Sequence, residues 1–255
     1  MRLIPFLVLL VAGLLGCGAH AETLKVLTTG AYKQMVVAMA PIFTAQSGHQ
    51  LDIQNDTAGA LVKRIDAGES FDVLVLTPGP IRAFVNAGKI AESSVTPLAK
   101  VAIGLAIPAG LPAPRLASVE DFKQILQGAR RIAYINPASG GSSGIYLDGL
   151  FQRLGLAEMI RPKAVLVNGG LVAEKLISRE ADLAIHQISE ILPVKDVTLI
   201  GPLPEEIQNY TVYVGAINKT TQHESAASAF LARLTSPAAQ QVMQSKGMLP
   251  VTISQ

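Results

Sequence analysis

Residues 140–144 read GGSSG, the Gly-x-Ser-x-Gly pattern in which many hydrolases place a nucleophilic serine. In those enzymes the serine stands on a sharp turn directly between a strand and a helix, and a histidine activates it. Here the strand expected at 130–136 is separated from Gly140 by Pro-Ala-Ser, and no spacing relates Ser142 to a histidine. The histidines beyond the N-terminal segment are His49, His186 and His223. A secreted serine hydrolase that uses Ser142 is therefore the weaker alternative, and a ligand-binding turn is the stronger one.

Small and hydroxyl-bearing residues recur at four places where an expected strand gives way to an expected helix. These turns cover residues 28–31, 56–59, 139–144 and 168–170, and none of them contains Arg or Lys. A helix N-terminus carries unpaired N–H groups and a partial positive charge, and small residues let a ligand approach them closely. Such residues are also ordinary turn and cap residues, so the prediction depends on their recurrence at strand ends, where open α/β sheets bind ligands. The candidate ligand-binding residues in these turns are Thr29, Gly30, Ala31, Thr57, Ala58, Gly59, Ser142, Ser143 and Gly169.

The composition argues against several other classes of function. The chain has 255 residues, a formal net charge of +2 and 16% charged residues, without a basic run, so nucleic acid is not an expected partner. The sequence has no His-Glu-x-x-His pattern and no Asp-rich calcium loop, and we expect neither a metal nor a cofactor. We therefore expect a protein that binds a small anion and is not an enzyme.

The N-terminus has the pattern of an export signal. One arginine precedes an apolar run that is too short to span a bilayer, and small residues ending in AHA at 19–21 follow it. We expect residues 1–21 to be a signal peptide that is cleaved after Ala21, which places the mature protein in the periplasm. Residues 14–17 read LLGC, so a lipoprotein anchored through Cys17 is the competing prediction.

Strand and helix patterns alternate along the rest of the chain, which is typical of α/β folds. Two such α/β series follow one another, and the last segment carries helices but too few strands for a domain of its own. We predict two interleaved α/β lobes joined by a hinge with two crossings, near residues 103 and 210. Lobe I would comprise residues 22–103 plus 211–255, and lobe II residues 104–210. A ligand would bind in the cleft between the lobes.

Five segments occur in an order that is known from one family: KVLTTGAYKQMVVAMAPIFTAQSG, NDTAGALVKRIDAGESFDVLVLTP, SSGIYLDGLFQRLG, EADLAIHQISEI and LTSPAAQQVMQSKGMLPV. In this order the chain resembles the periplasmic solute-binding proteins of ABC importers, within them the molybdate-binding-protein-like group. The resemblance covers essentially the whole mature chain. It implies the type II periplasmic-binding-protein fold, closure of two lobes on the ligand, and docking of a monomer on the membrane permease of an ABC importer. A ligand-sensing partner of a membrane receptor remains an alternative.

The resemblance also implies where the ligand is contacted. The two serines of the molybdate group fall on Ala31 and on or beside Ala58, and the tyrosine that closes the oxyanion site falls on Gln187. The second lobe would contribute Ser143 and the backbone of Gly169. Because a buried donor left unpaired costs about 1–3 kcal/mol, these changes should alter which anion is accepted. The ligand stays open between a molybdate- or tungstate-like oxyanion and a small organic carboxylate, which the donating and accepting amide of Gln187 would suit.

Overall fold

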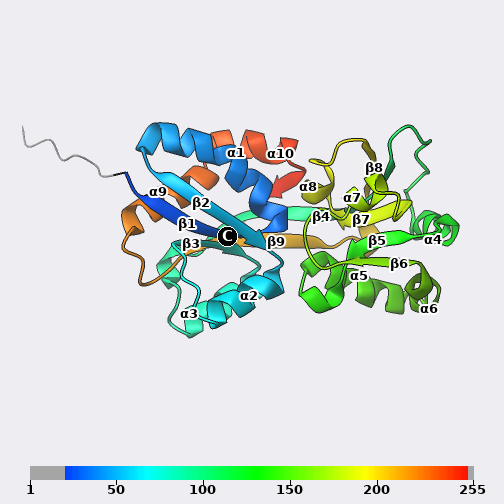
Figure 1. The fold of residues 1–255 in the computed structure, drawn as a ribbon, viewed down its shortest axis with the longest axis horizontal. Coiled ribbons are helices and arrows are strands. Elements are labelled where there is room, and N and C mark those ends of the chain that lie inside the picture. Colours follow the sequence, from blue (N-terminus) through cyan, green and yellow to red (C-terminus); the bar gives the residue numbers. More distant parts are fainter. Residues whose placement is uncertain (1–20, 252–255) are drawn as a thin grey trace, which may run out of the picture.

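The protein is described by a computed structural model that covers residues 21–251. The expected export signal, with its cleavage site and Cys17, therefore lies outside the described residues except for Ala21 itself. Within the described part, none of the helices has the length and apolar character that crossing a membrane requires. Figure 1 shows an elongated molecule with two lobes side by side, connected through the strands β4 and β9.

A mixed sheet runs through both lobes in the order β2-β1-β3-β9-β4-β7-β5-β6, and β8 and β10 each pair with β4. Parallel pairing joins β1 to β2 and β3, and joins β5 to β6 and β7, whereas β4 and β9 are antiparallel to their neighbours. The strands are β1 (Thr23–Thr29), β2 (Gln50–Asp56), β3 (Val73–Leu76), β4 (Thr96–Pro108), β5 (Ile132–Ile135), β6 (Ala164–Val167), β7 (Leu183–Gln187), β8 (Val197–Pro202), β9 (Tyr210–Ile217) and β10 (Met248–Pro250).

The long strand β4 carries the chain from the first lobe into the second. Its residues up to Ala102 pair with β9 and β10, and from Ile103 onward it pairs with β7 and β8. The chain returns to the first lobe through β9, which pairs with β3. The predicted fold of two interleaved α/β lobes with two crossings is thus confirmed. The lobe boundaries at 103 and 210 stay a prediction.

Helices cover both faces of the sheet in each lobe (Figure 1). In the first lobe α1, α9 and α10 pack on one face, and α2 and α3 pack on the other. In the second lobe α4, α5 and α6 share one apolar core, and α7 and α8 contribute to another. The helices are α1 (Gly30–Ser47), α2 (Ala58–Asp66), α3 (Pro78–Asn86), α4 (Val119–Gly128), α5 (Ser142–Arg153), α6 (Ala157–Ile160), α7 (Glu174–Ile177), α8 (Ile188–Ile191), α9 (Glu224–Leu234) and α10 (Pro237–Ser245).

Local sequence signals locate most of these helices, with one clear exception. Ser118 caps α4 as its sequence predicts, because its hydroxyl accepts from the N–H of Asp121 at 3.1 Å. The sequence of residues 171–181, LVAEKLISREA, predicts a helix, and this prediction is wrong, since only Glu174–Ile177 is helical. Arg179 has a φ of 59°, which is the left-handed conformation that ends a helix.

Candidate functional site

A pocket lies between the two lobes, where strand ends and helix starts from both lobes face each other. It brings together all of the predicted site residues except Gly59. Its cavity volume is about 40 Å³, which exceeds the ~10–15 Å³ that a single water needs. The predicted residues in its lining are Thr29, Gly30, Ala31, Thr57, Ala58, Ser142, Ser143, Gly169 and Gln187.

Thr29 and Thr57 form the wall of the first lobe, and their hydroxyls have different surroundings. Each is the extended residue before a helix, Thr29 before α1 and Thr57 before α2. The hydroxyl of Thr57 accepts from the N–H of Ala60 at 3.2 Å and donates to the carbonyl of Ser139 in the second lobe at 2.6 Å. The hydroxyl of Thr29 is buried and lies near the hydroxyl of Tyr213, but no group meets it with the geometry of a hydrogen bond. Thr29 therefore has an unused donor facing the pocket, whereas Thr57 has already used its proton.

The first turn of α5 forms the wall of the second lobe. β5 ends at Ile135, a single 3₁₀ turn occupies Pro137–Ser139, and α5 begins at Ser142 with Gly141 as its N-cap. The motif is therefore displaced from the strand end, unlike the sharp strand-to-helix turn on which hydrolases expose a serine.

None of the three histidines activates Ser142. His186 Nε2 lies 3.2 Å from Glu190, and its Nδ1 has no partner. The Nδ1 atoms of His49 and His223 both lie beside Glu22, at the start of β1. The geometry argues against the hydrolase alternative.

Gly59 lies at a contact between the lobes instead of in the pocket lining. Its N–H donates to the carbonyl of Gly140 at 3.1 Å. A Cβ added to Gly59 would lie 2.8 Å from the Cα of Gly140, and one added to Gly140 would lie 2.6 Å from the Cα of Gly59. The two backbones therefore approach as closely as only glycines allow. The geometry therefore favours a role for Gly59 in the contact between the lobes over its predicted role as a direct ligand contact.

Gln187 lines the pocket, but its amide is already engaged. The carbonyl Oε1 accepts from the hydroxyl of Tyr213 at 2.6 Å, and Nε2 donates to the hydroxyl of Thr211 at 3.2 Å. All three side chains are buried. Tyr213 itself lines the pocket and comes from β9 of the first lobe. A tyrosine therefore contacts residue 187, although it comes from β9 and not from position 187 itself.

A buried pair of titratable side chains, His186 on β7 and Glu190 on α8, lines the same pocket. His186 Nε2 lies 3.2 Å from Glu190 Oε2, and their side chains are only 2% and 9% exposed. Burial disfavours both charged forms, so it raises the pKa of Glu190 above its usual value and lowers the pKa of His186. The apolar segment around His186 predicts a packed strand residue, which the structure confirms, but no sequence signal relates His186 to Glu190.

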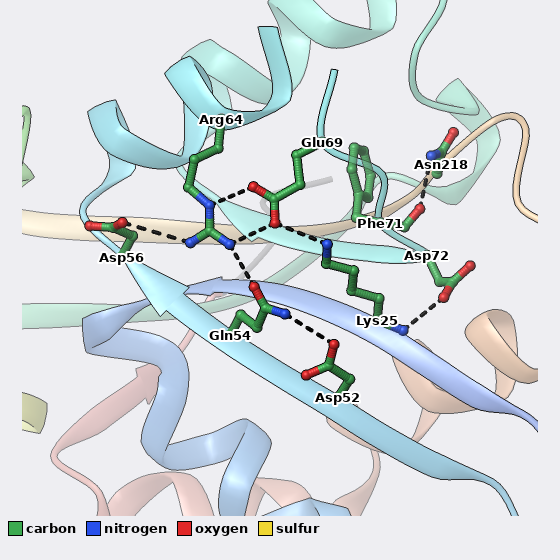
Figure 2. A network of polar contacts seen from close by, with 9 residues as sticks. All are labelled: Lys25, Asp52, Gln54, Asp56, Arg64, Glu69, Phe71, Asp72 and Asn218. Carbon is green, nitrogen blue, oxygen red and sulfur yellow. Dashed lines mark hydrogen bonds and ion pairs between the residues drawn. The ribbon is translucent and has the colours of Figure 1, made fainter. Parts of the chain in front are cut away.

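The pocket also contains one acidic side chain that is not buried, Asp56 at the end of β2. Its carboxylate lies 3.7 Å from Arg64 on α2, within the network of Figure 2. Arg64 in turn binds Glu69 through two hydrogen bonds of 2.6 and 2.7 Å, and Lys25 reaches Glu69 at 3.0 Å. Hydrogen bonds from Arg64 and Lys25 hold the pKa of Glu69 at about 2. The network therefore places the positively charged Arg64 next to Asp56 (Figure 2).

Sequence reasoning missed several lining residues. Most lack a local signal, because an isolated strand histidine, helix glutamate or strand tyrosine resembles an ordinary core residue. The missed residues are Asn55, Asp56, Ile135, Gly141, Gly170, His186, Glu190 and Tyr213. Asp56, Gly141 and Gly170 lie within the predicted turns but were not among the residues selected from them as ligand contacts. Among residues 21–251, no cluster of three or more acidic, histidine or cysteine side chains has the geometry of a metal site.

A family described as bacterial extracellular solute-binding protein matches residues 24–249 of the chain. The chain belongs to this family. Among curated proteins, this solute-binding protein is 31% identical over 235 residues to a protein from a Pseudomonas species named aconitate isomerase, with 90% of this chain and 88% of that protein covered.

Solved structures with this fold include the periplasmic molybdate-binding protein of Azotobacter vinelandii, with a TM-score of 0.76, 21% identity, and coverage of 90% of this chain and 100% of that one. The sulfate-binding protein SubI of Mycobacterium tuberculosis H37Rv has a TM-score of 0.72 and 16% identity, with coverage of 91% of this chain and 88% of that one. At these identities the likeness concerns the fold.

Proposed function

We propose that this solute-binding protein holds a small organic carboxylate between its lobes. The observation that carries the proposal is the hydroxyl of Thr29, which lines the pocket, is buried and has no partner. A buried donor in this state costs about 1–3 kcal/mol, and a bound anion would remove that cost. The first turns of α1, α2 and α5 supply further N–H groups at the same pocket.

The lining favours a carboxylate over a tetrahedral oxyanion such as molybdate, tungstate or sulfate. Ala31 and Ala58 provide no hydroxyls that could hydrogen-bond the additional oxygens of a tetrahedral oxyanion. Glu190 adds a buried carboxyl group that, when protonated, can donate to a carboxylate. The relative named aconitate isomerase supports an organic acid as the ligand class.

We further propose that the protein acts as a periplasmic monomer that closes on its ligand and delivers it to the permease of an ABC importer. The family description as an extracellular solute-binding protein supports this role. Ligand sensing for a membrane receptor would use the same closure. Deleting this protein separates the two roles, because the loss of a carrier stops substrate uptake whereas the loss of a sensor leaves the importer working.

The test is a thermal-shift panel followed by calorimetry. Dicarboxylates and tricarboxylates, molybdate, tungstate and sulfate are each added to the mature protein. At a ligand concentration 100 times Kd the folded state gains about 2.7 kcal/mol, which corresponds to a rise in Tm of about 5–10 °C for a chain of this size. The substitution Thr29→Val should weaken binding about 10–100-fold, because it removes one hydrogen bond to a charged group. Ser93→Ala, at an exposed serine outside the pocket, is the control. A response to oxyanions alone would overturn the carboxylate proposal.

A second candidate function is isomerisation of an organic acid, and it rests on the pair His186 and Glu190. Moving a double bond or a proton requires groups that take up and return a proton, and the pair supplies two such groups at the pocket. The relative's name supports the same reaction class. Incubating aconitate with the protein and following it by NMR decides between the candidates. Turnover that is lost in Glu190→Gln supports the enzyme, and unchanged aconitate with measurable binding supports the carrier.

A further inference from the structure

Glu190 is the one buried carboxyl group at the proposed ligand site, and its two oxygens face different partners. Oε2 lies 3.2 Å from His186 Nε2. Oε1 lies so close to Gly30, the first residue of α1, that an added Cβ at Gly30 would overlap it. Gly30, His186 and Glu190 all line the pocket. One oxygen therefore contacts the histidine, and the other lies at the helix start where the ligand is expected.

The surroundings of Glu190 provide no cation to balance an ionised carboxylate. α8 packs against α1, β4, β7 and β8. The titratable side chains of these elements are Tyr32, Lys33, Lys100 and His186. Lys100 lies over the ring of Tyr210, 4.8 Å from its centroid, and Tyr32 is a buried hydroxyl. Lys33 does not line the pocket. Among the described residues, His186 is the basic side chain that contacts Glu190. Burial disfavours the charged form of His186, so this contact does not supply a cation.

Two other titratable groups reach the pocket from outside these elements, and neither is a cation. The hydroxyl of Tyr213 on β9 donates a hydrogen bond to Gln187, and burial raises the pKa of Tyr213. Asp56, at the end of β2, carries a negative charge, and Arg64 lies 3.7 Å from its carboxylate. An ionised Glu190 would thus add a second negative charge next to a bound anion, in a region of low dielectric where repulsion is strong.

We infer that Glu190 binds the ligand as a neutral carboxylic acid. Its Oε1–H donates to a carboxylate of the ligand, while its Oε2 accepts from the Nε2–H of neutral His186. This inference rests on the proposed function, because it needs a ligand that presents a deprotonated acceptor. It makes ligand binding depend on one proton: wherever the free protein has lost the proton of Glu190, binding must take one up.

The dependence on pH has a definite direction. Burial raises the pKa of Glu190, so the carboxyl group keeps its proton in acid and loses it as the pH rises. The affinity should be constant at low pH and fall about tenfold for each pH unit above the pKa of Glu190, since one proton is taken up per ligand. An isolated carboxyl group is ionised above about pH 5. The last carboxyl group of a dicarboxylate or tricarboxylate keeps its proton to higher pH, because the charges already present repel a further one, so the titration of the free ligand is subtracted from the measured proton uptake.

The experiment is calorimetric titration of the mature protein with a dicarboxylate and a tricarboxylate between pH 6 and 9. Buffers of different ionisation enthalpy report the protons taken up. The wild-type protein should lose affinity toward high pH and take up as much as one proton. Glu190→Gln keeps a donor of the same shape without a proton to lose, so it should bind with the acid-pH affinity of the wild type, independently of pH and without proton uptake. Glu190→Met keeps the length but has no donor, so it should bind at least tenfold more weakly at every pH. Glu92→Gln, at an exposed glutamate, is the matched control.

The outcomes distinguish this inference from the proposed function. Binding by the wild-type protein that is independent of pH and takes up no proton overturns the inference and leaves the carboxylate function intact. The same holds if Glu190→Gln keeps the pH dependence. If no carboxylate binds the wild-type protein at any pH, the proposed function itself is wrong, and the inference falls with it. Melting curves of each variant establish that it is folded, and the proton uptake of the wild-type protein needs no variant at all.

Discussion

Gly59→Ala should weaken ligand binding without destabilising the fold. Gly59 lies in α2 with an ordinary helical conformation, so alanine is compatible with its backbone and, as a better helix former, favours it slightly. Its added Cβ would lie 2.8 Å from the Cα of Gly140, and ordinary contacts begin near 3.4 Å. The lobes would therefore have to separate by about 0.6 Å at this point, the difference between these two distances.

This separation weakens two of the hydrogen bonds that join the lobes beside the pocket. The bond from Gly59 N–H to the carbonyl of Gly140 would lengthen from 3.1 Å to about 3.7 Å, beyond a hydrogen bond. The bond from the Thr57 hydroxyl to the carbonyl of Ser139 would lengthen from 2.6 Å to about 3.2 Å. Losing one bond and weakening the other costs about 1–2 kcal/mol of closure, which corresponds to a 5–30-fold increase in Kd.

The assay is calorimetric measurement of Kd together with the Tm of the ligand-free protein. Gly79→Ala is the matched control, because Gly79 also lies in a helix of the first lobe and an added Cβ there meets no atom within 4 Å. We expect a higher Kd for Gly59→Ala, with a ligand-free Tm equal to or above that of the wild type. A Kd within twofold of the wild type would refute the reasoning, because the lobes would then not need this approach to hold the ligand. An equal loss of affinity in the control would refute it as well.

Three further predictions concern other contacts at or near the pocket. Gly144→Ala should lower the free energy of unfolding by about 2–3 kcal/mol, measured by denaturant melting, since its Cβ would overlap the carbonyl oxygen at the end of β5. Arg64→Met should weaken anion binding severalfold by exposing the charge of Asp56, and adding Asp56→Asn should restore it, which a double-mutant cycle of Kd values measures. Stability should rise with pH from the lowered pKa of folded His186, about 3, to about 4.5, because the unfolded state binds the extra proton there. Between 4.5 and 6.5, the ordinary pKa values of unfolded Glu190 and unfolded His186, the two effects oppose each other. From 6.5 up to the raised pKa of Glu190 stability should fall, because only the folded state keeps the glutamate proton there. Melting temperatures of Glu190→Gln across pH should lack the fall toward alkaline pH.

Much of the architecture could be predicted from local patterns. Alternating apolar runs and glycine-terminated helices place β1–β3 and α1–α3 in their order, and Ser118 marks the start of α4. The edge strands β8 and β10 were not expected, because a short and half-exposed strand has no continuous apolar run. The helix predicted at 171–181 is longer than the observed α7, because hydrophobic periodicity does not reveal the left-handed conformation of Arg179 that ends it.

The four turns illustrate what the sequence determined by itself. Small residues after a strand and before a helix are a local property, so Thr29, Thr57, Ser142 and Gly169 could be named before their neighbours were known. The displacement of Ser142 from the end of β5 is also local, and it already argued against a nucleophile.

The contacts between these turns arise only in the folded protein. It places Gly59 against Gly140 between the lobes, and it engages Gln187 with Tyr213 instead of leaving its amide free. It also buries His186 and Glu190 together at the pocket. These contacts depend on how β4 and β9 carry the chain between lobes, and burial alone shifts the proton equilibria of the pair. A sequence states which groups are present, whereas the distances and the loss of water that give those groups their chemistry arise only when distant segments pack together.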